Sequence, residues 1–228
     1  MRIEIIDKNE ASSFFQRFEH LGNCGLGVWH YGCYEGVTLQ SVISFGISNF
    51  NPQRSKIGNI AQRYNLKIIQ LNRGGTRFDA PINTPSKAVS LALKQIRQDK
   101  GNSIIVAYSD TKWNEIGTIY QASNFLYLGV TNPKGQANYR VNGRVVSGWN
   151  IRKKFGTRNM SILESEVDSI EKIPLSPKHI YIYVNANKSI RKAVAKELNS
   201  KCKSYPKRIE LSVGSMHEIW LVRDATKC

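Results

Sequence analysis

Residues 67–129 constrain the fold more than any other part of the chain. Residues 67–72 form an apolar run with β-type alternation, and residues 103–108 form a second, short β-rich run. Between them, residues 86–98 carry apolar side chains at helical spacing. A strand, a helix and another strand in this order predict two parallel strands joined by a right-handed crossover. We therefore expect an α/β or α+β domain with a mixed central sheet flanked by helices.

The two ends of this unit are expected to frame a site. Gly74 and Gly75 follow the first strand and are predicted to break it. A second helix is predicted over residues 115–128, where apolar side chains recur at helix-like spacing at Ile116, Ile119, Tyr120, Phe125 and Leu128. In such units, ligands bind at the carboxyl ends of the strands, next to the start of the first helix.

The start of the first helix suits an anion. Thr84 is expected to be the N-cap and Pro85 the first helical residue, while Ser86 and Lys87 add a hydroxyl group and a positive charge. Free backbone N–H groups and the helix dipole favour a negatively charged group there, for example a pyrophosphate. Plain capping without a ligand explains the same residues.

The charge of the chain points to a polyanionic partner. It has 33 Lys and Arg against 17 Asp and Glu, which gives a formal net charge of +16. Such an excess favours nucleic acid through counterion release and electrostatic steering. The alternative is a basic protein without a specific partner.

The remaining bulk features are expectations about class. Hydrophobic residues make up 41% of the chain, enough for a core, and no apolar run is long enough to predict a membrane span. The first residues lack an apolar signal core, so no export signal is expected. The four cysteines show no CxxC spacing, which predicts reduced thiols, a cytoplasmic location and no zinc site.

Residues 134–158 form a basic segment without an acidic residue. The turn signal Asn142-Gly143 predicts a hairpin. Its basic side chains are Lys134, Arg140, Arg144, Arg152, Lys153, Lys154 and Arg158, with Tyr139, Trp149 and Phe155 interleaved. Positive charges with aromatic rings suit a surface that follows a phosphate backbone and stacks on bases. A solvated basic hairpin is the alternative.

The rest of the chain is predicted to complete one domain. The hairpin over residues 25–45 turns at Glu35-Gly36, and residues 46–64 form a polar loop that leads into a short helix. The other expected elements are a strand at Arg2–Ile6, a helix over 11–21 that ends near His20, an acidic helix over 160–173, a strand over 178–184, a helix over 189–199 and closing strands over 209–222 that contain His217. We thus expect a single domain over 1–228, with a basic DNA-contacting insertion at 131–158 and C-terminal elements at 174–228 that complete the sheet.

The crossover unit resembles the core of the GNAT acyltransferase fold. The aromatic-rich run IYQASNFLYLG, residues 119–129, follows it. In that fold the pyrophosphate of acyl-CoA lies at the start of the first helix, and the second helix usually ends with an aromatic residue after a small one, as Asn124-Phe125 does here. The run NTPSKA, residues 83–88, stands in place of the usual glycine-rich phosphate loop.

Four runs are similar to the phage Mom family: LNR at 71–73, PINTPSK at 81–87, AYSD at 107–110 and GTIYQASNF at 117–125. Lys178-His179 and the run YPK at 205–207 are also similar to that family. The resemblance covers roughly residues 70–130 and 178–207. The first sixty residues diverge, and His20 is the main point of comparison there.

This resemblance implies a GNAT-like transferase that modifies the exocyclic amine of adenine in double-stranded DNA. The product would carry a methylcarbamoyl-type group, which protects phage DNA from host restriction enzymes. Acetyl-CoA would be the donor, iron is suggested as a requirement, and the host cytoplasm would be the location. Neither the donor nor the metal is evident in the residues themselves.

The resemblance and the chemistry together assign four catalytic candidates. Asp110 would accept or orient a proton at the adenine amine, which is a poor nucleophile because its lone pair is delocalised into the ring. Tyr120 would protonate a leaving thiolate or hold the donor, and Arg73 would stabilise a developing oxyanion or hold a carboxylate or phosphate. His20 is a candidate base or metal ligand.

Each candidate also has a plainer role. Asp110 would cap the helix that follows it, and Tyr120 would be a core residue. Arg73 would contact a DNA phosphate, and His20 would complement the dipole of its helix.

Binding residues follow from the same hypothesis. Ser86 and Lys87 would bind the phosphates of the donor, and Thr84 and Asn124 would lie beside them. DNA would be bound by Arg140, Arg144, Trp149, Arg152, Lys153 and Lys154. The target adenine would have to be flipped out of the duplex, with Trp149, Tyr139 or Trp113 filling the gap or stacking on the base.

Two other functions compete with this one. An ordinary N-acetyltransferase acting on a protein or small amine would more often have an acidic substrate groove, which the charge of +16 disfavours. A non-catalytic DNA-binding protein on a GNAT-like fold is the third possibility.

Overall fold

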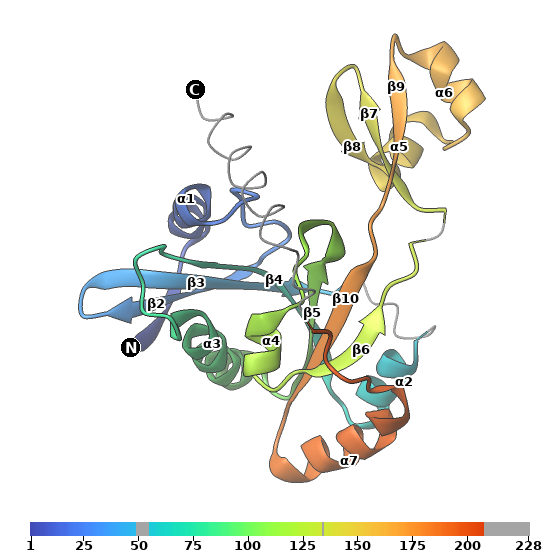
Figure 1. Ribbon diagram of the computed structural model, residues 1–228. Coiled ribbons are helices and arrows are strands. Elements are labelled where there is room, and N and C mark those ends of the chain that lie inside the picture. Colours follow the sequence, from blue (N-terminus) through green and yellow to red (C-terminus); the bar gives the residue numbers. More distant parts are fainter. Residues whose placement is uncertain (49–54, 134, 208–228) are drawn as a thin grey trace.

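The computed structural model describes residues 1–48, 55–133 and 135–207. Its centre is a seven-stranded sheet with the strand order β1-β2-β3-β4-β5-β10-β6 (Figure 1). These strands are β1 Arg2–Ile6, β2 Trp29–Glu35, β3 Thr38–Ile47, β4 Lys67–Thr76, β5 Ser103–Asp110, β6 Leu126–Val130 and β10 Lys178–Asn185. β4 and β5 are parallel, and the other neighbouring pairs are antiparallel.

Helices cover both faces of this sheet. They are α1 Lys8–Phe18, α2 Lys56–Arg63, α3 Thr84–Lys100, α4 Thr118–Ala122 and α7 Lys188–Leu198. α3 packs on the face that carries Ile105 and Ala107 of β5, whereas α2 and α7 pack on the face that carries Ile104 and Val106. Because side chains alternate along a strand, the helices lie on opposite sides. The predicted mixed sheet flanked by helices is therefore confirmed.

A second, small sheet stands apart from the first (Figure 1). It is inserted between β6 and β10, with the order β8-β7-β9 and the strands β7 Ala137–Val141, β8 Arg144–Ser147 and β9 Ile170–Pro174. Two short helices accompany it, α5 Gly148–Phe155 and α6 Met160–Glu166. Ala137, Tyr139, Ile151 and Leu163 form its own buried cluster. We call residues 135–174 the small sheet unit.

The small sheet unit is attached beside the end of β5. The N–H of Thr131 donates to the carbonyl of Lys178 at 2.8 Å, and the Thr111 hydroxyl donates to the carbonyl of Pro177 at 2.7 Å. Lys178 is the strand partner of Asp110. Both connecting segments thus lie next to the residue predicted to be catalytic.

Two predictions in the central unit were wrong. Gly74 and Gly75 do not break β4, because they pair with Ile43 and Val42 of β3 and the strand continues to Thr76. A side chain at Gly75 would press on the ring of Phe15, since a Cβ there would lie 3.1 Å from it, so glycine allows α1 to approach the sheet.

The predicted helix over residues 115–128 is mostly not a helix. α4 covers Thr118–Ala122, and Asn124 adopts a left-handed conformation with a φ of 58° that ends the turn. The following residues form β6, which pairs with β10. Pairing with a distant strand therefore overrides the local apolar spacing.

Smaller differences concern element ends. α1 begins and ends earlier than predicted, and the acidic segment 160–173 divides into α6 and β9. The loop at residues 49–54 and the closing strands with His217 lie outside the described residues. Among the described residues, the helices are too short or too polar to traverse a bilayer.

Gly117 offers a test of this packing. Gly117 has a φ of 68°, and a Cβ there would lie 2.5 Å from the ring of Tyr181. Gly36 has a φ of 57° with no atom within 4 Å, so it is a matched control for backbone strain alone. Both Gly→Ala variants should lose about 1 kcal/mol of unfolding free energy from the left-handed backbone. Gly117→Ala should lose a further ~1–3 kcal/mol through the clash. Urea denaturation measures both losses, and equal losses would show that Gly117 does not pack on Tyr181.

Candidate active site at the parting of β4 and β5

The two parallel strands separate halfway along their length. β4 and β5 pair from Lys67–Ser103 to Leu71–Ala107, and the paired residues end there. Beyond this point β4 continues with β3, while β5 continues with β10. Asn72 is an extra residue in β4, because Leu71 lies opposite Phe45 and Arg73 lies opposite Ser44. The sheet therefore opens between residues 72–76 of β4 and residues 108–110 of β5. We call this opening the parting of β4 and β5.

Three buried polar atoms without partners lie on residues that flank this opening. They are Nδ2 of Asn72, Nε of Arg73 and Oγ of Ser109. Nη1 of Arg73 donates to the carbonyl of Asn72 at 2.8 Å, and its guanidinium lies close to Gly25, where a Cβ would be 3.3 Å from Cζ. Buried polar groups normally have partners, so these atoms mark the region as a candidate site. The oxyanion role of Arg73 stays a prediction.

Tyr120 faces the same region from α4. Its ring packs against Phe125 and Tyr181, each with a centroid separation of 5.4 Å. Burial raises the pKa of the Tyr120 phenol, the charge of Glu115 raises it further, and Arg73 opposes both. The raised pKa keeps the phenol protonated near neutral pH. Tyr120 therefore presents a hydroxyl group and not a phenolate to this region, and it holds its proton more tightly than a free tyrosine.

Asp110 ends β5 and has structural partners. Its Oδ1 accepts the N–H of Lys112 at 2.9 Å and caps the 3₁₀ helix η2, Thr111–Trp113. Its Oδ2 lies 3.7 Å from Nζ of Lys178, and its own N–H donates to Oε2 of Glu115 at 3.3 Å. The capping alternative is thus present in the structure. It uses one carboxylate oxygen and leaves the other beside Lys178.

The ring of His20 contacts Trp113, which lies in the 3₁₀ helix η2 directly after Asp110. His20 lies two positions beyond α1 and not in its last turn as expected, because Glu19 adopts an extended backbone. Its Nδ1 is 3.2 Å from Oε1 of Glu19, and its ring centroid is 6.2 Å from that of Trp113 in η2. His20 therefore belongs to the same edge of the sheet as Asp110.

The residues do not fit the iron that the resemblance suggested. Within the described ranges, no three or more His, Cys, Asp or Glu side chains form a group that could hold a metal ion. A stable iron site usually takes a cluster of histidines and carboxylates. No step is therefore assigned to a metal.

The start of α3 differs from prediction in its cap. Asn83 is the N-cap, without a side-chain capping bond, and Thr84 is the first helical residue, 3% exposed. Oγ of Ser86 donates to the carbonyl of Asn83 at 3.1 Å. Thr84 is therefore a core residue at this helix start and not its cap.

Ser86 and Lys87 line a cavity of about 340 Å³ together with Met1, Ser90, Leu91 and Ala122. Asp110 and Tyr120 line neither this cavity nor the larger one described next. Helix α4 connects the smaller cavity with the parting, because it carries both Ala122, which lines the cavity, and Tyr120.

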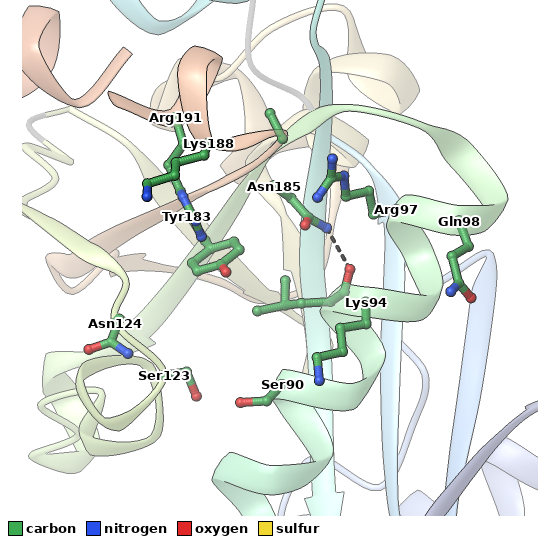
Figure 2. A pocket seen from close by; sticks show the side chains of 12 residues that line it. Ser90, Lys94, Arg97, Gln98, Ser123, Asn124, Tyr183, Asn185, Lys188 and Arg191 are labelled. Carbon is green, nitrogen blue, oxygen red and sulfur yellow. Dashed lines mark hydrogen bonds between the residues drawn. The ribbon is translucent and has the colours of Figure 1, made fainter. Parts of the chain in front are cut away.

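Asn124 lines a larger cavity of about 710 Å³ (Figure 2). The cavity lies between α3, the turn after α4, the end of β10 and the start of α7. Asn124 is exposed, whereas Thr84 is buried and lines neither cavity. Thus the four predicted donor-binding residues are divided between two cavities and the core.

The predicted DNA-binding residues lie on the small sheet unit. Arg140 is exposed and forms an ion pair with Glu171, which is also exposed. Tyr139 is 2% exposed, so it is a core residue and not a stacking ring. The other predicted side chains are exposed: Arg144, Trp149, Arg152, Lys153 and Lys154. Trp149 is 64% exposed, and Nζ of Lys153 lies 5.4 Å from its ring centroid.

Sequence reasoning missed three residues at the parting. Glu115 contacts the Asp110 backbone and acts on the Tyr120 pKa, and Lys178 faces the Asp110 carboxylate. Asn72 supplies an unpartnered amide. Glu115, a second carboxylate five residues after Asp110, could have been recognised in the sequence. Lys178 was noted only as part of the family resemblance, because its place opposite Asp110 depends on strand pairing.

Solved structures with a similar arrangement are acetyltransferases. Arabidopsis thaliana NAA60 in complex with acetyl-CoA is 8% identical, with a TM-score of 0.46, covering 80% of this chain and 97% of that one. A putative GNAT-family acetyltransferase from Desulfovibrio desulfuricans is 9% identical, with a TM-score of 0.46, covering 81% of this chain and 99% of that one. A Bacillus subtilis acetyltransferase in complex with CoA is 9% identical, with a TM-score of 0.41, covering 80% of this chain and 97% of that one.

Sequence comparison gives a more specific relationship. The methylcarbamoylase Mom of Escherichia phage Mu is 32% identical over 101 residues, which cover 44% of this chain and 41% of that protein. The match thus spans less than half of the phage protein. A model of the Mom protein family matches residues 1–207. Since this covers the great majority of the chain, the chain belongs to the Mom protein family.

Proposed function

We propose that this chain is a transferase that moves an acyl group from an acyl-CoA thioester to the exocyclic amine of adenine in double-stranded DNA. The observation that carries the proposal is the position of the small sheet unit. Its two connecting segments are tied to Thr111 and Lys178, the residues next to and opposite Asp110. DNA held by the cationic side of this unit would lie beside the parting of β4 and β5.

Membership of the Mom family supports the choice of substrate. The phage Mu relative is named a methylcarbamoylase, and the matching segment contributes 41% of its length. A group on the adenine amine would change the hydrogen-bond donor that this base presents in the major groove. Restriction enzymes that read this hydrogen-bond donor would then be blocked, so the modified DNA would be protected.

The acceptor half of the reaction uses the carboxylates. The adenine amine attacks the thioester carbonyl, a nitrogen–carbon bond forms, and the amine loses a proton. Asp110 accepts this proton through the oxygen that does not cap η2, with Glu115 as the neighbouring carboxylate. Nζ of Lys178 lies 3.7 Å from Oδ2 of Asp110, the carboxylate oxygen that does not cap η2.

The donor half uses the other two residues. Arg73, with its unpartnered Nε, stabilises the negative oxygen of the tetrahedral intermediate. The carbon–sulfur bond then breaks, and Tyr120 donates its proton to the leaving thiolate. The raised pKa of the Tyr120 phenol ensures that this proton is present at neutral pH. Transfer of an acetyl group would not supply the nitrogen of a methylcarbamoyl group. The proposal therefore covers the acyl-transfer step only.

The target base must leave the duplex to reach this site. Trp113 is 53% exposed and lies in η2, directly after Asp110. Its ring also contacts His20. We assign Trp113 as the surface on which the flipped adenine stacks, with His20 behind it, and Trp149 as a contact to the DNA that remains.

Asp110→Asn tests the proposal. Asparagine keeps an oxygen that can cap η2, so stability should change little, whereas the base is lost. Modification should fall by about 100-fold or more. Mass spectrometry of nucleosides from DNA of cells that express the protein measures it, and Asp168→Asn, an exposed carboxylate on the small sheet unit, is the control. A new adenine derivative in wild type and its loss in Asp110→Asn support the proposal. Unmodified DNA with acetylated protein would contradict it.

The DNA surface gives a separate test. Replacing Arg152, Lys153 and Lys154 with Ala should weaken DNA binding and reduce the salt slope by about 2 to 3, because each phosphate contact contributes roughly 0.9. The matched control replaces Lys192, Lys196 and Lys201, three exposed lysines near the C-terminal end of the described chain. Fluorescence anisotropy with duplex DNA at several salt concentrations compares them. Equal slopes for the two triple variants would show that α5 does not face DNA.

A further inference from the structure

Three neighbouring strands carry a polar row on the face of the central sheet that α1 covers. His30 of β2 lies opposite Ser44 of β3, and Ser44 lies opposite Arg73 of β4. Because residues directly opposite on antiparallel strands point to the same face, these three side chains lie on one side of the sheet. Val42, two residues before Ser44, shares this face and packs with α1. The proposed function uses Arg73 and leaves the other two residues without a role.

His30 and Ser44 form a buried pair. Nδ1 of His30 lies 2.6 Å from Oγ of Ser44, and the two residues are 4% and 0% exposed. Burial lowers the pKa of His30, the charge of Lys8 lowers it further, and Asp7 opposes both. The ring is therefore neutral near neutral pH. A pair at this depth does not contact a substrate, so its effect on the reaction passes through its neighbours.

One of these neighbours is the segment that precedes β2. We call residues 24–28 the glycine segment. A Cβ at Gly27 would lie 3.0 Å from Cε1 of His30 and 3.0 Å from Cβ of Ser44. A buried ring and a Cβ have little freedom to move, so only glycine lets the segment lie this close. The glycine segment is thus seated on the buried pair.

The same segment lies against Arg73. A Cβ at Gly25 would lie 3.3 Å from Cζ and 3.3 Å from Nη2 of Arg73, so the backbone of the segment lies beside the guanidinium. Gly25 has a φ of 56°, and its N–H donates to Oδ1 of Asn23 at 2.8 Å. Nη1 of Arg73 donates to the carbonyl of Asn72 at 2.8 Å. The guanidinium is therefore held by its own strand and by the glycine segment.

We infer that His30 and Ser44 are positioning residues: the glycine segment seated on them holds the guanidinium of Arg73 where the transfer reaction needs it. The role of Arg73 in that reaction rests on the proposed function, whereas the contacts do not. An arginine side chain has several rotatable bonds, and restricting it beforehand removes an entropic cost from the reaction. A displacement of about 1 Å at such a group costs about 100-fold in rate.

Gly27→Ala tests the seat of the segment. The methyl group would meet the buried pair and lift the glycine segment away from Arg73. Gly32→Ala in β2 is the matched control, because a Cβ there would lie 2.9 Å from Ile6 and 2.9 Å from Leu39, away from the segment. Both variants should lower the unfolding temperature. Only Gly27→Ala should lower adenine modification, by about tenfold or more for the same amount of folded protein, with unchanged affinity for duplex DNA. Nucleoside mass spectrometry of DNA from expressing cells and fluorescence anisotropy measure the two.

Chemical labelling of Arg73 gives a readout that does not depend on activity. Phenylglyoxal reacts with guanidinium groups, and peptide mass spectrometry follows the adduct on Arg73. Labelling should be several-fold faster in Gly27→Ala than in wild type and in Gly32→Ala, because the segment no longer covers the group. Equal rates in all three proteins would overturn the inference. In the Arg73→Ala background, Gly27→Ala should cause no further loss of modification, because no guanidinium is left to position.

Ser44→Ala tests the buried pair itself by removing the hydroxyl that His30 contacts. The control is Ser41→Ala in the same strand, where the serine is 0% exposed and its Oγ donates to the carbonyl of Gly75 at 2.6 Å. Both variants lose a buried hydrogen bond and should lower the unfolding temperature by similar amounts. Only Ser44→Ala should also lower modification and speed the labelling of Arg73. If Ser44→Ala matches Ser41→Ala in both of these readouts, the pair has no positioning role.

Failure of the proposed function gives a different result. If wild type forms no adenine derivative, the proposed function is wrong. Faster labelling in Gly27→Ala would then still support the glycine segment as the holder of Arg73, and equal labelling would overturn it.

Discussion

The end of the pairing between β4 and β5 is the constraint on which the site depends. Five residue pairs hold the parallel strands together, and then Asn72 enters β4 as an extra residue. Beyond that point β4 stays paired with β3, and β5 stays paired with β10. The sheet therefore stays intact while its middle opens. Three of the buried polar atoms left without partners in the described residues lie on Asn72, Arg73 and Ser109, which flank this opening. Because buried polar groups normally have partners, these atoms are the reason to look for a ligand here.

The arrangement of charge follows the same division of the chain. β10 pairs with β5 and brings Lys178 opposite Asp110, and the segments that enter and leave the small sheet unit are tied there. In that unit, Arg144, Arg152, Lys153 and Lys154 lie on β8 and α5, which carry no acidic residue. Arg140 on β7 and Lys172 on β9 instead lie near carboxylates such as Glu171.

Much of the fold could be predicted from local patterns because those patterns report burial directly. The alternation in β4, the apolar stripe of α3 and the run of β5 gave the parallel crossover, and Glu35-Gly36 gave the hairpin of β2 and β3. The prediction over residues 115–128 was wrong because β6 is a strand by virtue of pairing with β10, fifty residues away. Similarly, Gly74 looked like a break, but its neighbour β3 extends the strand through it.

The position of the candidate site could be predicted from the sequence better than its contacts. Asp110 and Arg73 lie on neighbouring parallel strands, as the crossover predicts, because the carboxyl ends of such strands meet at one edge. The catalytic roles of Asp110, Arg73 and Tyr120 stay predictions. The capping of η2 by Asp110 was one of the two roles that the sequence predicted for it. The pairing of Arg140 with Glu171 depends on neighbouring strands and no local pattern reveals it.

The sequence by itself determined the parallel crossover, the excess of positive charge and the residues of the Mom family. The tertiary structure decided which cations are free, which rings are exposed, and that the glycine segment lies against Arg73. The reason is physical: periodicity records whether a side chain is buried, whereas the partner of a charge is set by elements that meet only when the sheet is assembled.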